Sequence, residues 1–358
     1  MPWAIYRDDP NWVPHLIIER KQTLNKAKNP FFQHADMQLF LATKNAQIVG
    51  RIAAIRNDAH NEYHGDKAGF YGFFECINDQ EVANQLLSAT RDWLAKQGLD
   101  TMLGPASPSS NYEWGMLISG FNKLPGFLMP YNPDYYPSLV ENYGMRKAQD
   151  FFAYRLHSSA LLAEKALGRR LEVIRKRFRI NLRPLDIRNF GDELKKYQQI
   201  YNLAWAHNWG FVPLGDEEID RIGKELKPLI DPDLVIFAEI EGETIGAALA
   251  MPDLNPVIQK MNGKLFPFGL LRLLSGRKKM DAGRILTLGV VPKFHGKGVD
   301  ALLYYEVAKT GNEKGIDVGE ASWILEGNKM MNRGVELMKG ELSKSYRIYE
   351  SSIEPSGR

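Results

Sequence analysis

The residues best suited to chemistry lie in one short loop between an expected strand and an expected helix. An apolar, strand-like run is followed by His295, Gly296, Lys297 and Gly298, and a helical pattern starts at Val299. Glycines let successive backbone N–H groups point into one concavity, and the unpaired N–H groups at a helix N-terminus add partial positive charge. The loop therefore predicts an anion site, best suited to a pyrophosphate, with a histidine and a lysine beside it.

The elements that position this loop occur twice along the chain. Residues 39–54 and residues 235–250 each predict a strand, a polar turn and a second strand. Because the hydrophobic period then changes from two to 3.6 residues at the same relative points in both halves, we infer an internal duplication. The expected strand, helix and strand after each hairpin span residues 69–74, 82–96 and 100–104 in the first half, and residues 284–291, 299–314 and 317–325 in the second.

Composition limits the class of protein. The chain has 358 residues, 44% hydrophobic and 25% charged, which predicts two globular domains. With 46 basic and 43 acidic side chains the net charge is only +3, so we expect no DNA partner. The single cysteine, Cys76, cannot form a disulfide framework, and the histidine spacing indicates no metal site. Without a leader sequence or an 18-residue apolar run, we expect a cytoplasmic protein.

The strand, loop and helix of the second half resemble the acyl-CoA site of the GNAT superfamily of N-acyltransferases. The motif of that family is Arg/Gln-x-x-Gly-x-Gly/Ala, and His295, Gly298 and Asp300 occupy its three positions here. His295 and Asp300 depart from the motif, so binding would depend on the backbone donors of residues 296–300, with Asp300 turned away as a helix cap. The whole chain also resembles a group of bacterial tandem-GNAT proteins, through the phrases NPFF at 29–32, GFFE at 72–75, YNPDYY at 131–136, NWGFVP at 208–213 and YRIYE at 346–350.

This resemblance implies a fold and a substrate. The fold class is α/β (α+β), with two GNAT-like domains in tandem, each a mixed, mostly antiparallel sheet flanked by helices. In GNAT proteins two strands, here 284–291 and 317–325, separate to admit the pantetheine arm of acetyl-CoA or another acyl-CoA. The acyl-CoA-binding residues so implied are Leu288, Gly289, Val290, His295, Gly296, Lys297, Gly298, Val299, Asp300 and Asn328.

Direct attack of an amine on the thioester requires a group that takes the amine proton. Glu320 lies on the second separating strand and, by the period of two, on the same face as Ser322, so we expect Glu320 to be the base. Glu326 is the other carboxylate beside that strand. Many GNAT relatives carry a general-acid tyrosine where this chain has Val335, and Tyr346 is the expected substitute.

The first half lacks the loop. Residues 74–82 contain three acidic side chains where the motif would stand, and their charge repels phosphate. We therefore predict a degenerate GNAT-like domain without a CoA loop at 1–156, a basic helical connector at 157–183, and a GNAT-like acyl-CoA-binding domain at 184–358.

Two groups of residues are candidates for contact with an amine acceptor. The first is the pair of aromatic and amide-rich loops at 104–115 and 131–136 in the first half. The second is Trp205, Trp209 and Phe211, which follow a helical pattern in the second half. A cluster of core aromatics at a helix end is the alternative for the second group.

Residues 255–280 form a basic and apolar insertion. They carry Lys260, Lys264, Arg272, Arg277, Lys278 and Lys279 but no acid, around a strongly apolar run. Such a segment either lies on an anionic membrane surface or packs on the sheet with its lysines solvated, and with the basic connector it could also hold RNA.

The function that these features favour is acyl-CoA-dependent N-acylation, with acetyl transfer to a small-molecule or peptide amine as the first expectation. Two alternatives remain open at this point. One is a non-catalytic GNAT pair that binds CoA or a metabolite, and the other is a membrane-peripheral or tRNA-linked acyl or aminoacyl transferase. Acceptor, acyl length and oligomeric state are left open.

Overall fold

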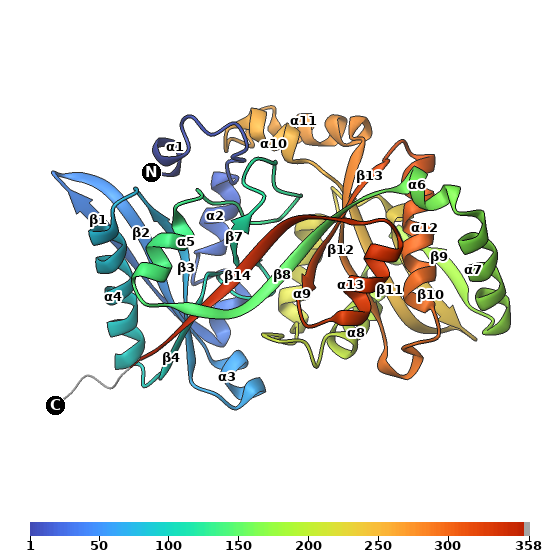
Figure 1. Ribbon diagram of the computed structural model, residues 1–358, viewed down its shortest axis with the longest axis horizontal. Coiled ribbons are helices and arrows are strands. Elements are labelled where there is room, and N and C mark those ends of the chain that lie inside the picture. Colours follow the sequence, from blue (N-terminus) through green and yellow to red (C-terminus); the bar gives the residue numbers. More distant parts are fainter. Residues whose placement is uncertain (354–358) are drawn as a thin grey trace.

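The computed structural model describes residues 1–353 and shows a mixed α/β architecture in which one large sheet is flanked by helices (Figure 1). The first half contains α1 (Pro2–Ile5), α2 (Ile17–Thr23), β1 (Ala35–Lys44), β2 (Gln47–Asn57), α3 (Asp58–His64), β3 (Ala68–Cys76), α4 (Gln80–Lys96), β4 (Thr101–Gly104), β5 (Ala106–Ser107), β6 (Glu113–Trp114), β7 (Met116–Ser119), α5 (Tyr136–Asn142) and β8 (Arg146–His157). Among the described residues no helix has the length and apolar character needed to cross a bilayer.

The second half begins with the segment expected to be a helical connector. Its elements are α6 (Ser158–Ala163), α7 (Lys165–Arg177), β9 (Asn181–Pro184), α8 (Phe190–Ala204), α9 (Asp216–Leu226), β10 (Val235–Ile240), β11 (Glu243–Pro252), α10 (Asn255–Met261), α11 (Gly269–Gly276), β12 (Ala282–Val290), α12 (Val299–Glu313), β13 (Val318–Leu325), α13 (Lys329–Leu337) and β14 (Glu341–Ser352). The last part of the connector is thus the edge strand β9, which pairs with β10.

The two hairpins share one irregularity. In the first, Ala42 pairs with Gly50 and the register shifts directly after Ala42. In the second, Ala238 pairs with Gly246 and the register shifts directly after Ala238. A β-bulge is a specific feature of a strand pair and not a random irregularity. Because a bulge occurs at the same position in both hairpins, the similarity of the two stretches in the sequence corresponds to a repeated structure.

The two halves exchange their long terminal strands. The sheet runs β1-β2-β3-β4-β14-β8-β13-β12-β11-β10-β9. The C-terminal strand β14 pairs with β4 of the first half, while β8 of the first half pairs with β13 of the second. Figure 1 shows β8 and β14 running together across the middle of the molecule. A boundary at residues 156/157 therefore falls at the end of β8 in sequence, although β8 lies between strands of the second half in space.

In each half a long helix packs its apolar residues on the sheet, and in the second half α8 also packs on the sheet. In the second half, Leu302 and Leu303 of α12 are buried against Ile236 and Ala248 of the sheet. The helix α4 buries its leucines against β2 in the corresponding way. Each fully buried leucine contributes about 1.5–3 kcal/mol. These two cores hold the strand edges that form the site.

Candidate active site

The strands β12 and β13 separate part of the way along their length. They pair in parallel only from Ala282 opposite Val318 to Ile285 opposite Ala321. Beyond this point β12 continues to Val290 and β13 to Leu325 without pairing to each other. A cavity of about 210 Å³ lies at the gap. The separation predicted from the GNAT resemblance is therefore present in the fold.

This strand-gap cavity brings together many of the residues predicted to bind acyl-CoA. Those in its wall are Leu288, Gly289, Val290, His295, Gly296, Asp300 and Asn328. Lys297, Gly298 and Val299 lie in the same loop but outside the cavity wall. Asn328 is the N-cap of α13 and accepts a hydrogen bond from the backbone N–H of Met331.

The loop before α12 leaves the N-terminal donors of that helix free for a ligand. Gly298 is the N-cap in a left-handed conformation (φ 77°), and no side chain caps the helix. Because the first N–H groups of a helix have no intrahelical acceptor, they point from this end toward solvent. The corresponding helix of the first half, α4, differs: the carboxylate of Asp79 accepts from the N–H groups of Glu81 and Val82. The first half thus satisfies its own helix terminus and needs no anion.

The two side chains that depart from the GNAT motif, Asp300 and His295, both line the cavity. Asp300 would repel a pyrophosphate unless its side chain turned away as a helix cap. In the structure α12 has no side-chain cap, and Asp300 lines the cavity. The N-cap residue of α12 is Gly298, which has no side chain that could accept a hydrogen bond from the first N–H groups of the helix. His295 bonds through Nε2 to the carbonyl oxygen of Val290 (2.7 Å), which fixes the ring at the end of β12.

A second, mostly apolar cavity of about 280 Å³ lies between the sheet, α8, α9 and the loops of both halves. Its wall includes the predicted acceptor residues Trp205, Trp209 and Phe211, together with residues 110–112 and Trp114 of the first half. The loop at 131–136 lies elsewhere, around or beside a small polar cavity in the first half. Of the two loops, only 104–115 contributes residues to the wall of the apolar cavity.

The two cavities share a common wall. The residues that line both are Trp205, Asn208, Leu286, Thr287, Trp323 and Leu325. The sequence analysis identified only Trp205 of this set. We call this set the junction, because its residues line both the strand-gap cavity and the apolar cavity.

Helix α8 presents three aromatic rings to the junction. Tyr197, Tyr201 and Trp205 stack in succession, with ring centroids 6.5 and 5.0 Å apart. The Tyr197 hydroxyl lies 2.6 Å from Thr287 Oγ1 on β12, and the Tyr201 hydroxyl donates to Asn111 Oδ1 of the first half (2.8 Å). Burial raises the pKa of Tyr197 to about 12, so its hydroxyl remains protonated. The spacing of four residues was the available sequence signal for this row.

Glu320 lies beside the cavities and not in their walls. Its Oε1 accepts from Ser322 Oγ (2.9 Å) and its Oε2 from Lys344 Nζ (3.0 Å). Ser322 also accepts from Arg284 Nε (2.9 Å) and lines the strand-gap cavity. The carboxylate fits because Gly126 has no Cβ, which would collide with it. Glu320 therefore reaches the ligand space only through the Ser322 hydroxyl.

Tyr346 lies in the core, away from both cavity walls. Its strand β14 pairs it with Phe151, its side chain is fully buried, and its hydroxyl has no partner among the described residues. Burial raises its pKa well above the ordinary value. The period of two along β14 directs this ring inward, so the structure does not bring Tyr346 and Asn328 to one site. Within residues 1–353 no group of three His, Cys, Asp or Glu residues is arranged to hold a metal ion.

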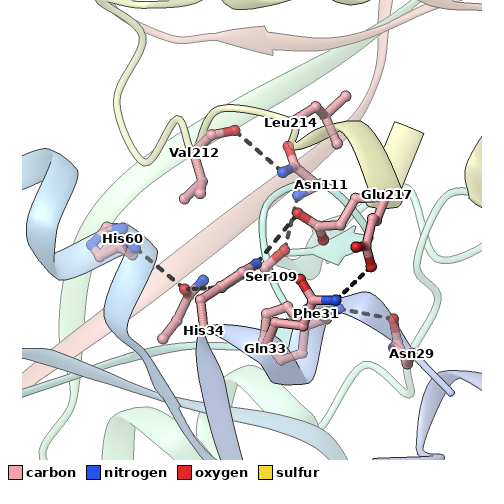
Figure 2. A network of polar contacts seen from close by, with 12 residues as sticks. Asn29, Phe31, Gln33, His34, His60, Ser109, Asn111, Val212, Leu214 and Glu217 are labelled. Atoms are coloured by element: carbon pink, nitrogen blue, oxygen red, sulfur yellow. Dashed lines mark hydrogen bonds and ion pairs between the residues drawn. The ribbon is translucent and has the colours of Figure 1, made fainter. Parts of the chain in front are cut away.

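A polar network holds the loops of the first half over the apolar cavity (Figure 2). Asn111 Nδ2 donates to the carbonyl oxygen of Val212 (3.2 Å) and Gln33 bonds to Glu217. His34 Nε2 lies 3.4 Å from the carboxylate of the buried Glu218. The hydrogen bond to Glu218 raises the pKa of His34 above its usual 6.5. These contacts join the two halves beside the apolar cavity, which Asn111 lines.

Comparison with solved structures defines the class of protein. A tandem GNAT protein from the clavulanic acid biosynthesis pathway superposes with a TM-score of 0.54 at 10% identity, covering 92% of this chain and 86% of that one. The fold is that of a tandem GNAT protein. No protein-family model matches the chain.

Two curated relatives define the family more narrowly. Protein YghO of Escherichia coli (strain K12) is 35% identical over 98% of this chain and 91% of its own length. The bacterial ceramide synthase of Caulobacter vibrioides is 36% identical over 99% of this chain and 93% of its own length. The chain belongs to the family that contains these two proteins.

Proposed function

We propose that this protein transfers a fatty acyl group from its CoA thioester to the amine of a long-chain amino alcohol. The observation that carries the proposal is the junction, where the strand-gap cavity next to the glycine loop meets a larger apolar cavity. A GNAT fold supports acyl transfer in general. The apolar wall adds a reason to expect hydrocarbon chains, in place of the acetyl group and small or peptide amine first expected from the sequence.

The donor side of the site suits a CoA thioester. The free N–H groups at the start of α12 attract phosphates. The ammonium groups of Lys293 and Lys297 add to this attraction; they lie 5.5 and 4.6 Å from the ring of Phe294. The unpaired edge of β12 beyond Ile285 offers backbone groups to an extended arm. A CoA thioester held in this way would place its carbonyl at the junction.

The acceptor side suits a hydrocarbon chain with one polar end. One side of the apolar cavity has a wall of hydrocarbon and aromatic side chains, which includes Phe190, Val235, Phe237 and Leu249. The hydroxyl pair of Tyr197 and Thr287 lies at the junction, where a polar head would need hydrogen bonds. A relative that is 36% identical is named a bacterial ceramide synthase. Since a ceramide is the N-acyl derivative of a long-chain amino alcohol, that class of amine is the acceptor proposed here.

The transfer proceeds by direct attack. The amine nitrogen forms a bond to the thioester carbonyl carbon, the C–S bond breaks, and the products are an amide and the CoA thiol. We propose that the amine proton passes to Ser322 Oγ, whose own proton moves to Glu320 (2.9 Å). The leaving thiolate takes a proton from water. The ion pair with Lys344 and the hydrogen bond from Arg284 keep this chain aligned.

Mass spectrometry of the reaction products tests the proposal. The purified protein is incubated with acetyl-CoA, octanoyl-CoA or palmitoyl-CoA and with sphinganine, a short amino alcohol or a peptide amine. We expect an N-acyl product with sphinganine and a long-chain acyl-CoA. Product only from acetyl-CoA and a short or peptide amine would contradict the long-chain proposal while retaining acyl transfer.

Two observations favour a second candidate, a non-catalytic protein that binds CoA. Asp300, an acidic residue, lines the cavity in which phosphates would bind, and Val335 is fully buried where many GNAT relatives have a catalytic tyrosine. CoA binding by calorimetry without turnover of any amine would support this candidate.

A further inference from the structure

We propose that the hairpin of helices α10 and α11, together with α1 and the start of α2, forms a docking surface for an anionic lipid bilayer. This proposal concerns the outer surface of the molecule and does not depend on the acyl-transfer chemistry. It is carried by exposed apolar side chains, by a surplus of positive charge, and by contacts that join two distant segments into one face.

The hairpin exposes large apolar side chains that the fold leaves uncovered. Phe266 and Leu271 are 67% and 65% exposed, and Phe268 is 63% exposed. Leu273 of the same hairpin is buried against the core beneath. The helix α11 therefore uses one side to pack on the protein and presents the other, apolar side to the surroundings. Single exposed apolar residues are ordinary, but such a cluster on one short hairpin indicates an interaction surface.

The N-terminal segment extends the same surface. Trp3 Nε1 donates to Asn262 Oδ1 (2.5 Å), and the N–H of Ile17 donates to the carbonyl oxygen of Gly263 (3.0 Å). Gln259 also bonds to the carbonyl oxygens of Pro10 and Trp12. Trp3, Ile17 and Ile18 are each 38–40% exposed. Figure 1 shows α1 on the same side of the molecule as α10 and α11.

The charge of this surface fits an anionic bilayer. Residues 255–280 carry basic side chains and no acidic one; Lys264 and Arg272, which lie next to the exposed apolar residues, are themselves exposed. The side chain of Lys278 lies outside the described part of the chain. Basic residues near an anionic membrane contribute about 1 kcal/mol each, and buried aromatic and aliphatic side chains add to this attraction. Phe266 and Phe268 have rings that can stack on RNA bases, but the aliphatic side chains of Leu270, Leu271, Ile17 and Ile18 beside them do not. A hydrocarbon layer accommodates both kinds of side chain, so the bilayer is the occupant proposed.

Vesicle co-sedimentation of the full chain tests the proposal. The probes are vesicles of phosphatidylcholine alone and vesicles that also contain phosphatidylglycerol. We expect binding only to the second kind, with binding that weakens as salt is added. The variant K264Q/R272Q should weaken it about 30-fold, the equivalent of about 1 kcal/mol for each lost charge. The variant F268S/L271S should weaken it by at least about tenfold.

A matched control comes from the β1–β2 hairpin at the far end of the sheet. Leu39, Leu41 and Ile48 are 52–62% exposed there, and L39S/L41S/I48S should bind vesicles like the unaltered protein. Unfolding temperatures of all variants should agree with the unaltered protein, because every substituted side chain is exposed. Absence of binding to anionic vesicles, equal binding to both kinds, or binding unchanged in both α10–α11 variants would overturn the proposal. Displacement of bound vesicles by added tRNA would also overturn it, in favour of an RNA surface.

Discussion

The Ser322 hydroxyl lies 2.9 Å from Glu320 Oε1, and of these two residues only Ser322 lines the strand-gap cavity. The carboxylate expected to accept the amine proton is thus one hydrogen bond removed from the substrate. Lys344 balances the charge of the Glu320 carboxylate, and the carboxylate occupies the space that a Cβ on Gly126 would otherwise fill. A residue placed in this way acts through its neighbour.

The first prediction follows from that relationship. In S322A the connection between the cavity and Glu320 is lost, so kcat should fall by about 10²-fold or more while KM for acyl-CoA stays the same. The loss of the hydrogen bond from Arg284 should cost about 1–3 kcal/mol of stability. Steady-state kinetics measures the former and chemical denaturation the latter. S343A, a buried serine on β14 outside both cavities, is the control and should keep kcat; an equal kcat for S322A would remove Glu320 from the mechanism.

The second prediction concerns the loop before α12. In G298E a side chain must enter a left-handed backbone position where its Cβ lies 3.0 Å from Ile174 Cδ1, and its charge lies beside the phosphate donors. We expect calorimetry to show no CoA binding by G298E. A ligand at one hundred times its Kd stabilises the folded protein by about 2.7 kcal/mol, and this stabilisation should be absent in G298E. G315E places the same side chain at the other end of α12, also at positive φ (84°) but with no atom within 4 Å. It should still bind CoA, and unchanged affinity in G298E would contradict the assignment of the loop.

The third prediction concerns chain length. Ile222 of α9 lines the apolar cavity and is only partly buried, so a tryptophan there fills space without distorting the core. I222W should raise KM for a long-chain amine or acyl-CoA about tenfold and leave acetyl transfer to a short amine unchanged. I187W, at an exposed position outside the cavity, is the control. Equal effects on short and long substrates would show that the cavity does not hold the hydrocarbon chain.

The fourth prediction concerns pH. Burial raises the pKa of Asp253 from 3.8 to about 6, with the nearby Glu320 adding to the shift. Since the folded-state pKa is above the unfolded one, the ionised carboxylate costs stability, and this cost grows as pH rises from about 4 to above 6. D253N keeps the oxygen that accepts from the N–H of Asn255. Its gain in unfolding free energy should be larger at pH 8 than at pH 5 by on the order of 1 kcal/mol.

The control for this effect is D192N, at an exposed carboxylate in the first turn of α8. Denaturation at the two pH values should show no comparable change for it. Besides Glu320, the charged groups that face Asp253 are Lys344 and Arg284, and both lower its pKa. A gain for D253N that is the same at pH 5 and pH 8 would mean that Asp253 does not titrate in this window.

Local patterns in the sequence were sufficient for the elements and the loop. The helix predicted at 299–314 is α12 (Val299–Glu313), and the strand predicted at 317–325 is β13 (Val318–Leu325). The junction could not be predicted in this way. Trp205, Thr287 and Trp323 come from three separate segments, and only the packing of α8, β12 and β13 brings them together.

The exchange of strands was equally hidden, since β8 and β14 have the same alternating pattern whichever half they join. The alternating pattern indicates that one face of the strand is buried, but it does not determine which strand pairs beside it. The same limit applied to Tyr346, whose side-chain direction depends on the register of β14 against Phe151. Position in the sequence therefore suggested a catalytic tyrosine where tertiary structure has a core residue.

The strand exchange also sets the order in which the chain can complete its fold. β14 (Glu341–Ser352) is inserted between β4 and β8, so the sheet of the first half stays open at β4 until almost all of the chain has been synthesised. Contacts between residues this far apart close slowly, because the loop entropy is lost before they form. The β4 edge of the first half is thus unpaired until residues of the second half reach it. Each half depends on a strand of the other for a closed sheet, so the two halves form one folding unit.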